Sequence, residues 1–247
     1  MEHSWMLANL AGYCVFPANG FNFKTFNQAY FRQFGVEYDD LERHLSFKDT
    51  FNDTVYSRAE QPRIPLKTHR MWITHPVISI EMRDSVKNDT IFDEILATNR
   101  ALDDDNHTWE HYFWTNDAKA IPETVKWFKD NGFIIMELRD LPKNVYDPVL
   151  EGLVDSYLEE RFGAASDIIR FMILYVYGGF YLDMDYFVRK FDNEILYYFD
   201  SIHTRHRYYI NIIFNTYGLL VAPYHPETKV YLDIMREAHI KRGLQQV

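Results

Sequence analysis

GGFYLDMDY, residues 178–186, ends an apolar run with two aspartates, Asp183 and Asp185, one residue apart. We expect a strand over residues 180–185, in which both carboxylates point to the same face because residues i and i+2 share a face. Two carboxylates this close repel each other unless a cation lies between them. Mg²⁺ and Mn²⁺ take oxygen ligands, and the protein often supplies only one or two of them when phosphates supply the rest. The pair therefore predicts a divalent metal completed by a nucleotide diphosphate, with an acidic strand end facing water as the alternative.

Short apolar runs alternate with amphipathic runs on both sides of this stretch, which predicts an α/β fold with a mostly parallel sheet flanked by helices. The expected strands are residues 69–74, 110–115, 133–138, 180–185, 210–215 and 218–223. The expected helices are residues 90–102, 122–132, 147–163, 165–179 and 225–243. Ligands of such sheets bind beyond the carboxyl ends of the strands, which is where the two aspartates are expected.

Two domains are predicted: a mainly helical N-terminal extension over residues 1–60 and a core over residues 61–247, which we expect to be truncated or incomplete at its C-terminal end. DDDNH (103–107) is expected to be a solvated loop and not a second metal site. HTRHRYY (203–209) is expected to be a surface loop, with a basic loop that touches an acceptor as the alternative.

Composition and charge exclude several classes of protein. The formal net charge of −10 argues against a nucleic-acid binder, which normally presents a basic face. Cys14 is the sole cysteine, so no intramolecular disulfide can form. No apolar run reaches the length of a membrane span, and no basic residues precede the apolar N-terminal segment as in a signal peptide. We expect a cytoplasmic protein, and three Asn-x-Thr sequons give a lumenal location only weak support.

Asp167 and Arg170 lie three residues apart, on one face of the expected helix 165–179. A local salt bridge worth a few tenths of a kcal/mol is one interpretation. In the other, Asp167 binds sugar hydroxyls and Arg170 binds a sugar or phosphate oxygen, because the guanidinium is a rigid fork of donors.

The stretch ASDIIRFMILYVYGGFYLDMDY (165–186) resembles the signature of the glycosyltransferase family with an Asp-x-Asp sugar-binding region. That family includes yeast-type mannosyltransferases and the catalytic domains of clostridial glucosylating toxins. IPLKTHRMWITHP (64–76), WEHYFWTND (109–117) and NTYGLLVAPYHP (215–226) resemble its other conserved blocks, in the same order. HRMWITHP and PETVKWFKDNG are most similar to the bacterial effector branch, which modifies host proteins.

The resemblance implies a GT-A fold, a nucleotide-sugar donor, and Mn²⁺ or Mg²⁺ as cofactor. It implies these roles: Trp72 on the nucleotide base, Asn116 on the nucleotide or sugar, Tyr181 on the ribose, Ser166, Asp167 and Arg170 on the sugar, Asp185 on the metal, Asp183 on the metal through water or on the ribose, and Asn215 on the acceptor side. Two features depart from the family pattern. The first-strand block reads Leu66-Lys67-Thr68, and the chain stops at Val247, before a segment that usually adds a metal or diphosphate contact.

This resemblance implies that the protein transfers a hexose from a UDP-sugar to a hydroxyl group. The hydroxyl would belong to a protein acceptor, such as a host protein. Family members retain the anomeric configuration, and no residue suggests a covalent nucleophile, so we expect front-face attack. An effector secreted into a host cytosol fits this function, and a Golgi-type lumenal enzyme fits it less well. The alternatives are a glycan or glycolipid mannosyltransferase that uses GDP-mannose, and a non-catalytic sugar-nucleotide binding domain. A haloacid-dehalogenase-like phosphatase fits poorly, because Phe187 stands where that class needs Thr or Val.

Overall fold

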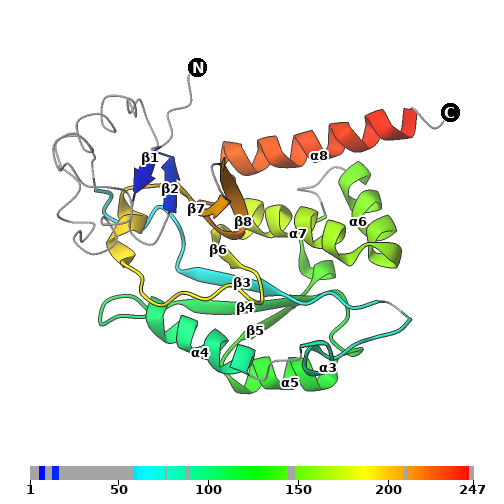
Figure 1. The fold of residues 1–247 in the computed structure, drawn as a ribbon, viewed down its shortest axis with the longest axis horizontal. Coiled ribbons are helices and arrows are strands. Elements are labelled where there is room, and N and C mark those ends of the chain that lie inside the picture. Colours follow the sequence, from blue (N-terminus) through cyan, green and yellow to red (C-terminus); the bar gives the residue numbers. More distant parts are fainter. Residues whose placement is uncertain are drawn as a thin grey trace.

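A central sheet with helices on both faces forms the protein in a computed structural model, which describes residues 6–8, 13–16, 58–75, 77–86, 90–143, 148–208 and 211–244 (Figure 1). The described part of the sheet has eight strands in the order β1-β2-β7-β8-β6-β3-β4-β5. Four of them are parallel neighbours: β3 (Lys67–Met71), β4 (Glu110–Thr115), β5 (Ile134–Glu137) and β6 (Gly179–Leu182). The other four join the sheet by antiparallel pairing: β8 (Asn211–Val221), β7 (Ser201–Tyr208), β2 (Tyr13–Phe16) and β1 (Met6–Ala8).

The α-helices are α3 (Met82–Ser85), α4 (Thr90–Leu102), α5 (Pro122–Asp130), α6 (Pro148–Glu160), α7 (Phe162–Tyr177) and α8 (Pro226–Leu244). Two 3₁₀ helices, η2 (Leu138–Asp140) and η3 (Asn193–Tyr197), follow β5 and precede β7. Within the described ranges, none of these helices has the length and apolar composition needed to cross a membrane.

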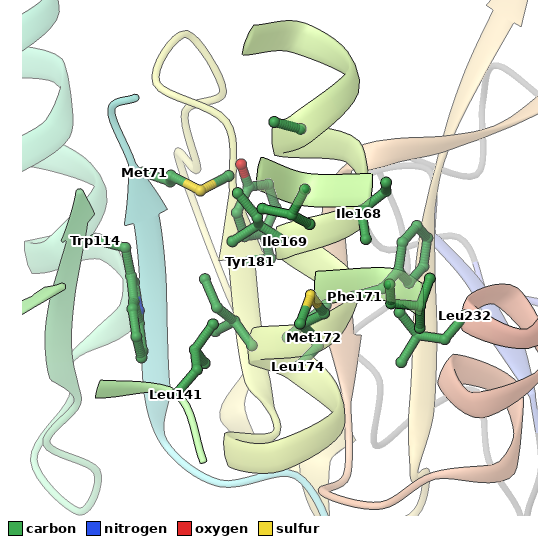
Figure 2. Packing of buried hydrophobic residues seen from close by; sticks show 14 of the residues in the cluster. Met71, Trp114, Leu141, Ile168, Ile169, Phe171, Met172, Leu174, Tyr181 and Leu232 are labelled. Carbon is green, nitrogen blue, oxygen red and sulfur yellow. The ribbon is translucent and has the colours of Figure 1, made fainter. Parts of the chain in front are cut away.

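Alternate residues of the strands pack into separate hydrophobic clusters, as expected where a sheet is covered on both faces. Phe113 of β4 packs with α4 and α5, whereas the next residue, Trp114, packs with α6, α7 and α8. Figure 2 shows the second cluster, in which Tyr181 of β6 lies on one side of α7 and Leu232 of α8 on the other. The helix that carries Asp167 and Arg170 is therefore held against both the sheet and α8.

Gly178 and Gly179 connect α7 to β6 in a way that other residues could not. Their φ angles are +59° and +96°, a region that favours glycine. A Cβ atom on Gly179 would lie 2.4 Å from the main-chain oxygen of Lys67, so the start of β6 lies too close to β3 for any residue with a side chain. The glycine pair thereby sets where β6 begins, and so where the aspartates after it lie.

His69 fixes the same junction from β3. Its Nε2 donates to the oxygen of Gly178 (2.8 Å), and its Nδ1 accepts from Trp114 Nε1 (3.1 Å), which defines a neutral tautomer. Burial lowers the pKa of His69 to about 3.

The α/β sheet with flanking helices confirms the predicted fold class, and α4 and β4 have the predicted bounds. Three predictions about strands were wrong. β6 ends at Leu182, before the aspartates; β8 is one long strand in place of two; and residues 203–209, expected as a loop, lie largely in β7, because that segment pairs with strands on both sides.

The predicted helical extension over residues 1–60 lies mostly outside the described residues. Where it is described before residue 58, it forms β1 and β2, which are strands and not helices. They extend the same sheet through the pairing of β2 with β7, and the division at residue 60 stays a prediction.

Candidate functional site

A cleft of about 630 Å³ opens where β3 and β6 end and α7 begins. Seven of the nine residues predicted for the site line it: Trp72, Ser166, Asp167, Arg170, Tyr181, Asp183 and Asp185. A cleft of this volume is typical of a site for a small ligand. It has an apolar side, formed by residues after β3, and a charged side, formed by α7 and the turn after β6.

Arg170 is the centre of the charged side. Its side chain is only 6% exposed, and its guanidinium lies 2.9 Å from Asp167 Oδ1 and 3.5 Å from Asp183 Oδ2. Its Nε donates to the main-chain oxygen of Ser166, and its guanidinium carbon lies 5.0 Å from the centre of the Tyr181 ring. The arginine therefore joins α7 to the end of β6, and the bond to Asp167 is more than a local surface pair.

Asp183 and Asp185 form an acidic pair at the rim of the cleft. Burial raises the pKa of Asp183. The charge of Arg170 and a hydrogen bond with Tyr181 lower this pKa, and the neighbouring Asp185 raises it again. Burial also raises the pKa of Tyr181 far above its usual value, so its hydroxyl keeps its proton. Arg170 is shared between Asp167 and Asp183, and the charge of Arg70 also acts on Asp183 and Asp185. A further cation on the open side would stabilise both aspartates of the pair.

A divalent metal fits this pair if another molecule supplies most of its ligands. In the part of the chain that the structure describes, no group of three or more His, Cys, Asp or Glu side chains could hold a metal. The two aspartates offer hard oxygen ligands, which suit Mg²⁺ or Mn²⁺, and phosphate oxygens are of the same kind.

The aspartates lie in a turn and not in the strand, so the alternation expected from the sequence does not orient them. Tyr186 N donates to the oxygen of Asp183 (3.0 Å), which closes the turn. Arg70 of β3, fully buried, donates from Nη1 to the oxygen of Asp183 (2.6 Å) and from Nη2 to the oxygen of Tyr186 (2.9 Å). Burial lowers the pKa of Arg70 to about 9.

Arg70 is a residue that sequence reasoning missed. The signal that could have found it is an arginine inside the expected strand 69–74. A cation at such a position needs a specific set of acceptors.

The segment after β3 forms the apolar side of the cleft. Trp72 is half-buried, and its Nε1 donates to the oxygen of Ile80 (3.1 Å). Asn116, predicted to contact the nucleotide or sugar, does not line this cleft. Its Oδ1 accepts from Thr74 N (3.0 Å) and its Nδ2 donates to the oxygen of Thr74 (2.7 Å), so it holds the segment that carries Trp72.

Asn215 lies on β8, and the structure places its backbone only. Leu182 pairs with Gly218 across the antiparallel β6–β8 ladder. Asn215 therefore lies beyond the carboxyl end of β6, at the same edge of the sheet as the two aspartates. Its proposed role toward the acceptor stays a prediction.

Comparison with known proteins gives one family match and several similar folds. Residues 92–202 match the family model "glycosyltransferase sugar-binding region containing DXD motif". The structure is similar to that of the PaToxG glycosyltransferase, with a TM-score of 0.60 and 17% identity, over 89% of this chain and 69% of that one. It is also similar to a transferase with two cysteine-to-serine substitutions, with a TM-score of 0.52 and 12% identity, over 73% of this chain and 80% of that one. A comparison with curated proteins found no match.

Proposed function

We propose that this chain, whose residues 92–202 match the model of a glycosyltransferase sugar-binding region with a DXD motif, is a metal-dependent, retaining hexosyltransferase. Its donor is a nucleotide sugar, with UDP-sugars favoured, and its acceptor is a hydroxyl of a protein side chain. The observation that carries the proposal is the buried Arg170, which lies against Asp167 and Asp183 in the same cleft as Asp185 and Trp72.

The two sides of the cleft suit the two ends of a nucleotide sugar. The half-buried Trp72 offers an aromatic face to a base. On the charged side, Asp167 is 60% exposed and so can accept hydrogen bonds from sugar hydroxyls while it stays paired with Arg170. Ser166 lines the same region, with its hydroxyl donating to the oxygen of Phe162.

Asp183 and Asp185 would hold the metal, which supplies positive charge against the leaving diphosphate when bound. Arg170 adds a permanent cation that is buried and held in place, and a fixed charge of this kind stabilises developing negative charge better than a mobile surface lysine. Tyr181, protonated beneath it, is placed to donate to Asp183 and to keep that carboxylate in one orientation.

Retention is implied by the family resemblance, and the described walls of the cleft bear on how the sugar would be transferred. Their aspartates are Asp167, Asp183 and Asp185, and each already has a role in the proposed donor site. Among the described residues, no further carboxylate lines this cleft to form a covalent glycosyl intermediate, so we propose that the acceptor hydroxyl attacks on the face that the diphosphate leaves. Analysis of the product by NMR tests this, and an inverted anomeric configuration would contradict it.

A protein acceptor and an effector role are supported by the first-strand block and the 122–132 block, which resemble the bacterial effector branch. GDP-mannose as donor for a glycan or glycolipid is the second candidate, favoured by the same DXD signature.

The test is hydrolysis of UDP- and GDP-sugars in the presence of Mn²⁺, with Asp185→Ala and, as a matched control, Asp105→Ala. Asp105 is an exposed aspartate in the loop after α4, outside the cleft. We expect one sugar nucleotide to be hydrolysed only with metal, at a rate that Asp185→Ala abolishes and Asp105→Ala leaves unchanged. Binding without turnover would support the non-catalytic alternative, and equal hydrolysis by both variants would exclude a role for the acidic pair.

A further inference from the structure

Arg70 is a buried cation that touches none of the carboxylate oxygens of the site. It is 0% exposed, it does not line the cleft, and the hydrogen bonds of its guanidinium go to main-chain oxygens of Asp183 and Tyr186. These two residues are the first and last of the turn that carries both aspartates.

The sheet itself does not hold this turn. The last ladder pair between β3 and β6 is His69 with Tyr181, and β6 ends one residue later. Beyond that point, the side chain of Arg70 bonds to the main-chain oxygens that no neighbouring strand pairs with in the described sheet. The oxygen of Asp183 accepts from both Tyr186 N and Arg70 Nη1, so one planar group holds both ends of the turn.

A buried cation at this position is costly. Buried ion pairs can often be replaced by apolar residues of similar size without loss of stability, so a buried charge is weak evidence for a stabilising role. The Nε of Arg70 also has no hydrogen-bond partner among the described residues. Stability alone therefore gives little reason for an arginine here, whereas the geometry of the turn gives a specific one.

We infer that Arg70 is a positioning residue, which holds the Asp183–Tyr186 turn in place before donor or metal binds. Its planar fork spans two carbonyl oxygens, and a lysine, whose ammonium is a single point of charge, cannot reproduce that span. The inference rests on the proposed function, since it concerns how the carboxylates of that site are presented.

The test compares Arg70→Lys with Arg189→Lys as the matched control. Arg189 also donates through its fork, to Glu94, but it is exposed and lies away from the cleft. The first measurement is hydrogen exchange of the Tyr186 amide in the metal-free protein, which does not depend on activity. The second is the binding of Mn²⁺ in the presence of UDP, followed by electron paramagnetic resonance.

In Arg70→Lys we expect faster exchange at Tyr186 and a weakening of Mn²⁺ binding of about 10- to 100-fold, the usual cost of removing a group that orients a metal ligand. Arg189→Lys should change neither. A merely structural role would lower the melting temperature of Arg70→Lys and leave the Mn²⁺ affinity of the folded protein unchanged, and that result would overturn the inference. Arg70→Met, which removes the fork altogether, should speed exchange at Tyr186 at least as much as Arg70→Lys does.

Failure of the inference and failure of the proposed function give different results. If the unmodified protein does not bind Mn²⁺ with UDP, the proposed function fails, and exchange at Tyr186 alone decides the role of Arg70. If it binds both and Arg70→Lys does so equally well, the inference fails and the proposed function stands.

Discussion

Replacement of Gly179 by alanine tests how β6 is placed beside β3. The residue has a φ angle of +96°, and an added Cβ would lie 2.4 Å from the oxygen and 3.2 Å from the carbonyl carbon of Lys67. Both of these atoms belong to the backbone of a buried strand, so no flexible side chain can move away. Either β6 must shift relative to β3 or the first pairs of the ladder must open.

Two costs add in this variant. A non-glycine residue in a sparsely populated backbone region costs about 1–3 kcal/mol. Overpacking in a rigid surrounding costs about another 1–3 kcal/mol. Together they lower the free energy of unfolding by about 2–6 kcal/mol, a large share of the roughly 5–15 kcal/mol that is typical of a protein domain.

The assay is equilibrium unfolding in urea, with Gly152→Ala as the control. Gly152 lies in α6, where an added Cβ meets no atom within 4 Å, so alanine there should stabilise the protein by about 0.5–1 kcal/mol. We expect the two midpoints to move in opposite directions. If Gly179→Ala unfolds at the same urea concentration as the unmodified protein, or follows Gly152→Ala, the close approach of β6 to β3 is refuted.

Because burial lowers the pKa of His69 to about 3, stability from its neutral form is complete above the unfolded pKa of about 6.5 and is lost as pH falls toward 3. Between pH 7 and pH 5 the free energy of unfolding should fall by about 2 kcal/mol, measured by urea unfolding, and His69→Gln should remove this fall; an equal pH dependence in both proteins would contradict the prediction. Arg170→Lys loses the guanidinium fork that is proposed to bind a sugar or phosphate oxygen of the donor. Charged hydrogen bonds of this kind are worth about 1.5–3 kcal/mol, so the donor KM should rise about 10- to 100-fold while circular dichroism is unchanged; an unchanged KM would refute this role. Trp109 Nε1 donates to Oδ1 of the buried Asn193 (2.9 Å), so Trp109→Phe should lower the free energy of unfolding by about 1–3 kcal/mol, and an unaltered melting temperature would argue against it.

Elements with a clear local pattern could be predicted from the sequence. α4 is amphipathic with helical spacing, and β4 is a short apolar run between polar segments, so their predicted bounds agree with the structure. β7 could not be predicted in this way. HTRHRYY is rich in charge, yet residues 203–208 form a strand, because β8 pairs with their backbone and β2 pairs with His203 and Thr204. The periodicity of the segment does not reveal this pairing.

The site divides in a similar way. Residues close together in the sequence, such as Asp167 and Arg170 or Asp183 and Asp185, could be assigned to one cleft from their spacing and from a family resemblance. Arg70 contacts the same turn across more than one hundred residues of sequence, and no local pattern encodes that contact. A sequence motif therefore identifies side chains proposed to contact the substrate more readily than side chains that hold the backbone in place.

The central claim is that the acidic pair binds a metal together with a nucleoside diphosphate. The most direct measurement is calorimetric titration of UDP with and without Mn²⁺, on the unmodified protein and on Asp185→Ala. If the claim is right, Mn²⁺ tightens UDP binding by about tenfold or more, UDP tightens Mn²⁺ binding by the same factor, and Asp185→Ala abolishes this coupling. UDP binding that is indifferent to Mn²⁺, or coupling that survives in Asp185→Ala, would contradict it.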